Sequence, residues 1–189
     1  ATEPILGMGF KAPDGYTMAT PLGEIAQHAD VSASFNDMII GLIPGSMGET
    51  SVIAIAIGAV ILLWTGIASW KTMLSVFLGG GLMAVVFEQL GMSSIPWYEH
   101  IVLGGFCFGA VFMATDPVTS ARTESGKWVY GALIGIMAVV VRVMNPGYPE
   151  GMMLAILFGN MFAPLIDYCV VDRNISRRSK RGAQKNANQ

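Results

Sequence analysis

Charged residues are scarce in this chain of 189 residues. Asp, Glu, Lys and Arg together make up 13% of the sequence, about half of their usual share in a soluble domain, whereas hydrophobic residues make up 53%. So little charge beside so much apolar surface falls outside the range of ordinary water-soluble folds. The composition therefore indicates an integral membrane protein.

Cysteine and histidine are also rare, with two residues of each. Cys107 and Cys169 show no C-x-x-C spacing and have no histidine close by, which argues against a metal site. We expect both cysteines to be small buried hydrophobes. His28 and His100 stand alone among polar residues, which is typical of a surface or an interface.

A basic start followed by an apolar core is missing from the first fifteen residues, so no signal peptide is expected there. The chain also begins without Met, which favours a processed chain or the later part of a longer one. Positive charge is instead concentrated in the last seventeen residues, where no aromatic side chains are interleaved with it. We therefore expect a solvated basic tail and no nucleic-acid binding. Its basic residues are Arg173, Arg177, Arg178, Lys180, Arg181 and Lys185.

Long apolar runs fill most of the remaining chain. A spanning helix needs about 20 predominantly apolar residues, and five runs near that length are separated by short polar segments. Many of them contain glycine, which suits close packing of helices in a bundle. The sequence therefore predicts an all-α membrane protein with five transmembrane helices. The predicted spans are 51–68, 72–91, 97–114, 128–144 and 151–171.

The segment 34–50, ahead of the first span, is apolar in its middle but too short to cross a membrane. Pro44, Gly45 and Gly48 interrupt it where a helix would have to continue. We interpret it as a broken half-helix that dips into the membrane and returns. Such re-entrant segments are tolerated where they line a cavity or are buried in protein.

An odd number of spans places the start of the chain and the basic tail on opposite sides of the membrane. Lys71, Arg122 and Lys127 would share a side with the tail, and the other side would receive only Lys11 and Arg142. By the positive-inside rule the tail is cytoplasmic. The predicted organisation is an outer-face loop with a short helix (1–33), the broken segment (34–50), a five-helix transmembrane repeat (51–171) and the cytoplasmic tail (172–189).

Carboxylates within or beside the spans are costly to bury and are therefore the first candidates for function. Glu49 follows the glycine-broken backbone of "GSMG", where oxygen ligands can meet a hard cation such as Na⁺, and it is equally suited to the first turn of the following helix. Asp116, in "ATDPV", either ends a helix before a proline or belongs to a cation site. Asp37 is the third candidate for a Na⁺ path.

Two further carboxylates and one glycine run have simpler explanations. Glu88 lies near the outer end of its span, where it can reach water, and Asp167 lies near enough to the cytoplasmic edge to pair with arginines of the tail. The glycine run 79–81 has no strand before it and no Lys or Ser/Thr after it in P-loop spacing. It predicts close packing against a neighbouring backbone.

The stretch "DGYTMATPLG" leads from a polar segment into a predicted short helix. Thr20 is a good N-cap and Pro21 fits the first helical position, and this role needs neither Asp14 nor Thr17. A phosphate ester on Thr20 would lie against the free backbone N–H groups of the same helix start, so both roles are compatible in geometry. Spacing alone favours the cap.

The same stretch resembles the flavinylation sequence D-x-x-[S/T]-G-A-[S/T] of membrane subunits that carry FMN on threonine through a phosphoester bond. Asp14, Thr17, Ala19 and Thr20 match it, and Met18 stands where glycine is usual. Four further motifs, in the same order, are similar to the C-terminal half of a flavin-bearing membrane subunit, the one designated B, of the Na⁺-translocating NADH:quinone reductase. They are "GSMGETS" (45–51), "FMATDPVTS" (112–120), "NPGYPEGMMLAILFGNMFAPLIDY" (145–168) and the "RRSKR" tail.

The resemblance implies an architecture and a reaction. Such subunits have about ten spans in two five-helix repeats, so this chain would be the second repeat with the flavin-bearing loop, one half of an inverted-repeat bundle. The complex oxidises NADH in another subunit and passes electrons through FAD, an iron–sulfur centre, two covalent FMNs and riboflavin to ubiquinone, coupled to Na⁺ export. Thr20 would be the FMN acceptor, loaded by a flavin transferase, in a multi-pass protein of the bacterial inner membrane that assembles with the other subunits.

Two other functions remain open on the sequence alone. The related membrane subunit of an Rnf-type ferredoxin:NAD oxidoreductase shares the flavin motif, "GETS" and "ATDPV" with this chain. The chain could also be half of a channel or transporter whose loop threonine is unmodified. The flavin motif is expected in the Na⁺-translocating reductase and in the Rnf-type subunit, but not in an unmodified channel or transporter.

Overall fold

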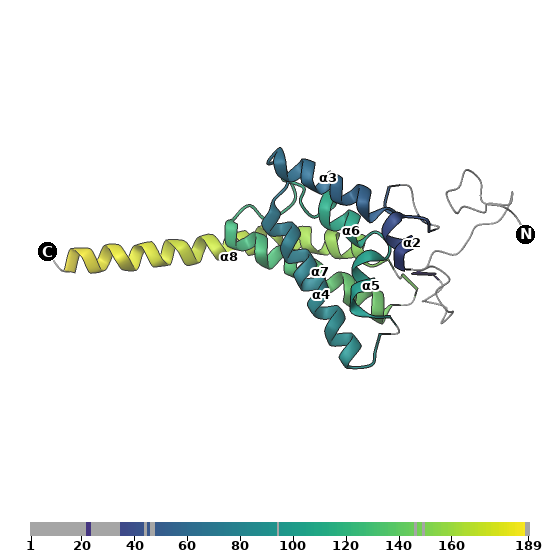
Figure 1. Ribbon diagram of the computed structural model, residues 1–189. Helices are drawn as coiled ribbons and strands as arrows, with labels where there is room; N and C mark the ends of the chain where they lie inside the picture. Colours follow the sequence, from purple (N-terminus) through teal and green to yellow (C-terminus); the bar gives the residue numbers. More distant parts are fainter. Residues whose placement is uncertain are drawn as a thin grey trace, which may run out of the picture.

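The computed structural model of the protein describes residues 22–23, 35–43, 45, 48–93, 95–145, 147–148 and 150–187, the last six of these by their backbone alone. Within that part of the chain the secondary structure is entirely helical (Figure 1), which confirms the all-α prediction there. The elements are α2 (Phe35–Ile40), α3 (Val52–Trp64), α4 (Trp70–Gln89), α5 (Trp97–Val102), α6 (Phe106–Phe108), the π-helix η2 (Gly109–Met113), α7 (Glu124–Met144) and α8 (Met152–Ala187).

Three of the described helices are long and apolar enough to cross a membrane: α4, α7 and the part of α8 from Met152 to Arg181. They correspond to the second, fourth and fifth predicted spans. α3 covers the first predicted span but has only 13 residues, a length of about 20 Å, which is less than the hydrocarbon core of about 30 Å. α8 does not end at the last apolar residue, and Figure 1 shows it running far beyond the other helices.

The third predicted span, 97–114, is not one continuous helix. α5 ends at Val102, and Gly104 has a φ of +63°, in the left-handed region that favours glycine. α6 then begins at Phe106 and continues directly as η2. The prediction of a continuous helix was wrong because the adjacent glycines Gly104 and Gly105 turn the chain inside an apolar run, where no polar residue marks the break.

The segment 34–50, which was expected to be broken, is interrupted at Gly41 in the described residues. α2 ends at Ile40, where Gly41 has a φ of +96°, and a Cβ built on Gly41 would lie only 2.8 Å from Cα of Ser51. The end of α2 therefore touches the start of α3, and Ser51 caps α3 by accepting a hydrogen bond from the backbone N–H of Ala54. The turn begins ahead of Pro44, which lies outside the described residues.

The centre of the bundle is the contact between α4 and α7, which approach each other through glycines. A Cβ on Gly79 of α4 would lie 2.6 Å from the carbonyl oxygen of Ala132 in α7, so the two backbones touch there. At Gly79 this confirms the close packing against a neighbouring backbone that was expected of the glycine run 79–81. Tyr130 and Ile134 of α7 are fully buried in the main apolar core beside this contact.

Large apolar side chains also cover much of the outside. In α3 only Ile55 is buried, while Ile57 and Trp64 are 59% and 88% exposed. A single protein surface in water rarely carries so much exposed apolar area, so this outer face requires lipid or further protein. The helix lengths and this surface together mark a helical membrane protein.

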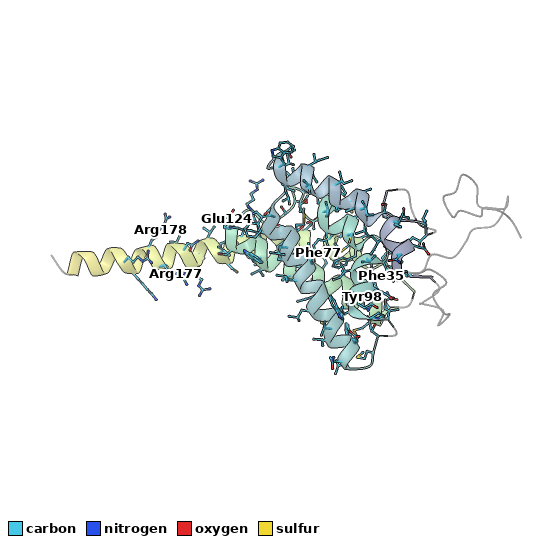
Figure 2. The ribbon with its side chains drawn as sticks, in the orientation of Figure 1. Phe35, Phe77, Tyr98, Glu124, Arg177 and Arg178 are labelled. Carbon is cyan, nitrogen blue, oxygen red and sulfur yellow. The ribbon has the colours of Figure 1, made fainter. Side chains whose placement is uncertain are left out.

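Charge separates the two ends of the bundle (Figure 2). Glu124 lies where α8 leaves the other helices, with Arg177 and Arg178 further along α8, whereas Phe35 and Tyr98 lie toward the opposite end. Glu124 accepts hydrogen bonds from Lys71 and Lys127, which brings the positive charges of two helices to the same end. We call the end with Lys71, Glu124 and Lys127 the tail end, and the end with Phe35 and Tyr98 the break end.

Candidate functional site

Two carboxylates converge where the third predicted span is broken. Glu150, just before α8, accepts a hydrogen bond through Oε2 from the backbone N–H of Gly105 at 3.2 Å. A Cβ built on Gly105 would lie 3.0 Å from Oε2 of Glu49 and 3.3 Å from Oε2 of Glu150. A side chain at this position would fit only if these carboxylates moved aside by a few tenths of an ångström. We call Glu49, Gly104, Gly105 and Glu150 the break site.

A buried arginine holds the other side of this break. Arg142 of α7 donates through Nη1 to the carbonyl oxygen of His100 at 2.6 Å and through Nη2 to those of Leu103 at 3.2 Å and Glu150 at 3.5 Å. These carbonyls belong to the end of α5 and to the loop before α8. Backbone oxygens freed by a broken helix need donors inside a membrane, and Arg142 supplies them.

Asp116 lies just after η2. It is therefore at the opposite end of the continuous segment α6–η2 from Gly105 and the two glutamates. Its carboxylate accepts hydrogen bonds from the hydroxyl of Thr119 at 2.8 Å and from the backbone N–H groups of Thr119 at 3.2 Å and Val118 at 3.3 Å. These bonds, with the Thr119 hydroxyl as the largest contribution, lower the pKa of Asp116 below its usual value. The carboxylate is therefore held in its ionised form.

A cavity of about 300 Å³ opens beside Asp116. Thr119 and Asn160 add polar groups to its wall, and Oδ1 of Asn160 accepts a hydrogen bond from the Tyr130 hydroxyl at 2.5 Å. The other lining residues are Met113, Met153, Ile156 and Leu157. We call Asp116, Thr119 and Asn160 with this cavity the loop site. An ionised carboxylate in the wall of a mostly apolar cavity is able to attract a cation.

The structure does not bring the three predicted Na⁺-path residues together. Glu49 lies beside Gly105, just before α6, whereas Asp116 follows η2, so the two carboxylates lie at opposite ends of that segment. Asp37 lies in the first turn of α2. No three His, Cys, Asp or Glu side chains of the described residues are close enough together to hold a metal ion. A cation path here would consist of separate carboxylates and not of one closed metal site.

Asp167 has a different partner from the one expected. It does not pair with arginine side chains of the tail but accepts hydrogen bonds from the backbone N–H of Arg122 and from the backbone and hydroxyl of Thr123. The carboxylate lies at the N-terminus of α7, where negative charge is favoured and the nearest donors are already fixed in place. Glu88 likewise accepts from a backbone group, the N–H of Trp97, at 3.3 Å.

The expectations for histidine and cysteine were partly wrong. His100 is buried, with Nε2 2.8 Å from Oγ of Ser93, because the neighbouring Trp97 and Tyr98 take the exposed positions of α5. Cys107 is buried as expected, but Cys169 is exposed, since it lies on the part of α8 that leaves the bundle.

The flavin motif residues Asp14, Thr17, Ala19 and Thr20 lie outside the described residues. Two residues after Thr20, however, Leu22 is described and is only 3% exposed. It belongs to a small apolar cluster with Met38, Ile43, Ile95 and Leu103. The chain directly after the motif is therefore anchored at the break end, close to Gly104.

Comparison with known proteins agrees with the sequence motifs. The profile of the NQR2, RnfD, RnfE family matches residues 3–176. A Na(+)-translocating NADH-quinone reductase subunit of Chromohalobacter salexigens, designated B, is 54% identical over 181 residues, which cover 91% of this chain and 44% of that protein. The protein of the same name from Klebsiella pneumoniae strain 342 is 50% identical over 187 residues, 92% of this chain and 45% of its own length. The chain thus spans less than half the length of these relatives.

Proposed function

The chain belongs to the NQR2, RnfD, RnfE family, and on that premise we propose that it is the C-terminal part of a membrane subunit of a Na⁺-translocating NADH:ubiquinone oxidoreductase. The observation that carries this proposal is the 54% identity, over 91% of the chain, to a relative named as a subunit of a Na(+)-translocating NADH-quinone reductase. The partners would be the other subunits of the complex, membrane lipid, Na⁺ and ubiquinone, with riboflavin as a further cofactor of the full subunit.

The proposed architecture is one half of an inverted-repeat bundle. It has five spans, a re-entrant segment at 34–50, the flavin loop on the outer face of the bacterial inner membrane and the basic tail in the cytoplasm. The gathering of Lys71 and Lys127 at the tail end supports this orientation. The contact of Gly41 with Ser51 supports a segment that enters and returns.

Covalent FMN on Thr20 is the central chemical element of the proposal. The motif residues support it, and so does the buried position of Leu22, which fixes the following chain at the break end. The FMN would supply one- and two-electron redox chemistry, and this chain's part is to tether it through the threonine oxygen and hold it at the outer face.

We expect denatured full-length protein from its native host to show flavin fluorescence in a gel, and Thr20→Val to abolish it, because only the hydroxyl can form the phosphoester. Thr65→Val, which removes an exposed hydroxyl at the end of α3, is the matched control and should keep the fluorescence. Fluorescence that persists in Thr20→Val would place the acceptor elsewhere. A colourless native preparation would favour an unflavinylated channel or transporter.

Glu49, Asp116 and Asp37 are the proposed residues of the Na⁺ path. Glu49 beside broken backbone and Asp116 beside a cavity support this role, at the two ends of α6 and η2. A Na⁺ ion would pass these carboxylates in turn rather than sit in one closed site.

Replacing Glu49 by Gln is expected to raise the Na⁺ concentration needed for half-maximal quinone reduction by roughly ten-fold, since a charged oxygen ligand is lost. Turnover of the purified complex as a function of Na⁺ measures this. Glu88→Gln, a carboxylate of α4 that accepts from Trp97, is the control and should leave the Na⁺ dependence as it is. An unchanged Na⁺ dependence in Glu49→Gln would remove that residue from the path.

A further inference from the structure

A second, larger cavity of about 420 Å³ opens at the tail end of the bundle, separate from the cavity beside Asp116. It lies between the turn that joins α3 to α4 and the loop that leads into α7. Lys71, Arg122 and Lys127 line it, and Glu124 is the one acid among its described lining residues. We call it the tail-end cavity.

The tail-end cavity carries an excess of positive charge. Glu124 accepts hydrogen bonds from Lys71 and, at 2.8 Å, from Lys127. Arg122 takes no part in this bridge, and its backbone N–H is bonded to Asp167. Among the described lining residues three cations accompany one carboxylate, so the lining is net positive, although the nearby Asp167 carboxylate also interacts electrostatically with Arg122. The lysine side chains are also only partly exposed, at 29% for Lys71 and 22% for Lys127, so solvent screens them incompletely.

The surroundings place this charge beside apolar surface. Trp70 and Trp128 contact each other edge to face, with ring centroids 6.0 Å apart, and Trp70 is 53% exposed. Ile67 and Val129 are exposed nearby in the sequence. Both α4 and α7, two helices long enough to span, begin here. Exposed tryptophans beside lysines at the start of spanning helices are typical of the membrane–water interface.

We propose that the tail-end cavity binds the phosphate headgroup of an anionic phospholipid. Lys71, Arg122 and Lys127 would bind the phosphate oxygens, and the acyl chains would lie along exposed apolar residues such as Ile67 and Trp70. Free inorganic phosphate shares the headgroup chemistry. The apolar rim favours lipid, because a free ion gains nothing from it.

The full-length protein with its associated subunits, reconstituted in phosphatidylcholine, provides the test. Electron paramagnetic resonance of spin-labelled phosphatidylglycerol and, separately, spin-labelled phosphatidylcholine gives the association ratio of the two lipids. We expect the wild type to prefer phosphatidylglycerol, and the loss of two cations in Lys71→Gln with Lys127→Gln to lower the ratio about five-fold. Glu124→Gln is expected to raise it, because the competing anion is gone.

Whether Glu124→Gln raises or lowers the association ratio distinguishes lipid binding by the lysines from a purely structural role of their bridge to Glu124. If the bridge only joins α4 to α7, removing either partner loosens that contact and neither variant gains affinity for phosphatidylglycerol. Arg122→Gln removes a cation outside the bridge and should lower the ratio even if the double lysine variant fails to assemble. Arg177→Gln with Lys180→Gln removes two charges from the exposed tail and is the matched control, expected to change the ratio less than the cavity variant does.

Three results would overturn the proposal. They are equal association of both lipids with the wild type, a lower ratio in Glu124→Gln, and an equal loss in the tail control. Calorimetric titration of inorganic phosphate into protein in phosphatidylcholine alone distinguishes the two phosphate sources. Heat that disappears in Lys71→Gln with Lys127→Gln, without any preference for phosphatidylglycerol, would assign the cavity to free phosphate instead of lipid.

Discussion

Asp167 joins two helices through one carboxylate. It accepts hydrogen bonds from the N–H of Arg122 at 2.8 Å, the N–H of Thr123 at 3.0 Å and the hydroxyl of Thr123 at 2.6 Å. The Thr123 hydroxyl in turn accepts from the N–H of Gly126 at 3.1 Å and so caps α7. One charge in α8 therefore fixes the start of α7.

Asp167→Asn is expected to lower the free energy of unfolding by about 1–2 kcal/mol, because the amide loses the charge and one acceptor oxygen at a helix N-terminus. Thermal unfolding of the detergent-solubilised protein measures this. Asp172→Asn, on the exposed part of the same helix, should cause little change, and so should Arg173→Gln with Arg177→Gln, since the tail arginines are not the partners. Equal destabilisation by all three changes would contradict the capping role.

The sequence indicates which charged residues are important, but it does not indicate their hydrogen-bond partners. Carboxylates near spans were identified as important, yet Asp167 bonds to residues 44 and 45 positions away, and no local pattern encodes such a contact. The charge pattern places Arg142 only at a helix end, although an arginine inside an apolar run is itself a reason to expect a buried partner. Its acceptors, the carbonyl oxygens of His100 and Leu103, are available because the chain breaks within 97–114, and no local pattern predicts that break.

At the scale of elements, the three consecutive glycines of α4 face different neighbours. A Cβ on Gly79 would lie 2.6 Å from the backbone oxygen of Ala132, whereas one on Gly81 would meet only the tip of Ile101 at 3.6 Å. The first position therefore sets the distance between α4 and α7, and the third does not. Two positions of α4 that are two residues apart are therefore expected to respond in opposite directions to the same Gly→Ala substitution.

Gly79→Ala should destabilise the protein by about 1–3 kcal/mol, since neither backbone can move aside without separating the helices. Gly81→Ala should stabilise it by about 0.5–1 kcal/mol, because alanine restricts the unfolded chain and fits the available space. Unfolding midpoints of both variants against the wild type provide the measurement. A loss of similar size at both positions would show that the close α4–α7 contact does not determine stability.

Element types were predictable where the polar boundaries were clear. α4, α7 and the apolar part of α8 match predicted spans because charged or polar residues flank them. The run 97–114 could not be divided correctly, since glycine occurs both in packed helices and at breaks, and the sequence does not distinguish these uses. The sequence also does not reveal how far α8 extends. Its basic residues end the apolar run at 171, but they are compatible with a helix, which continues to Ala187.

At the scale of the whole molecule, charge differs between the ends of one helical segment. Glu49 and Glu150 lie at the start of α6, whereas Asp116 follows η2 and the cations of the tail-end cavity lie beyond it. In the proposed orientation, Asp116 would meet Na⁺ from the cytoplasm and Glu49 would release it outside. Export would then run along α6 and η2, past carboxylates at the two ends of that segment.

This orientation requires an odd number of crossings, and α3 decides whether the number is odd. Its 13 residues are short for a span, so it crosses only where the bilayer thins or neighbouring segments extend it. We expect a green fluorescent protein fused after Ala187 of the full-length protein to fluoresce, and alkaline phosphatase at the same place to be inactive, since the basic tail stays in the cytoplasm. Alkaline phosphatase inserted just before α2 should be active, because that segment begins outside. Phosphatase activity at the tail would reverse the orientation, and reporters that place both positions on one side would mean that α3 does not cross.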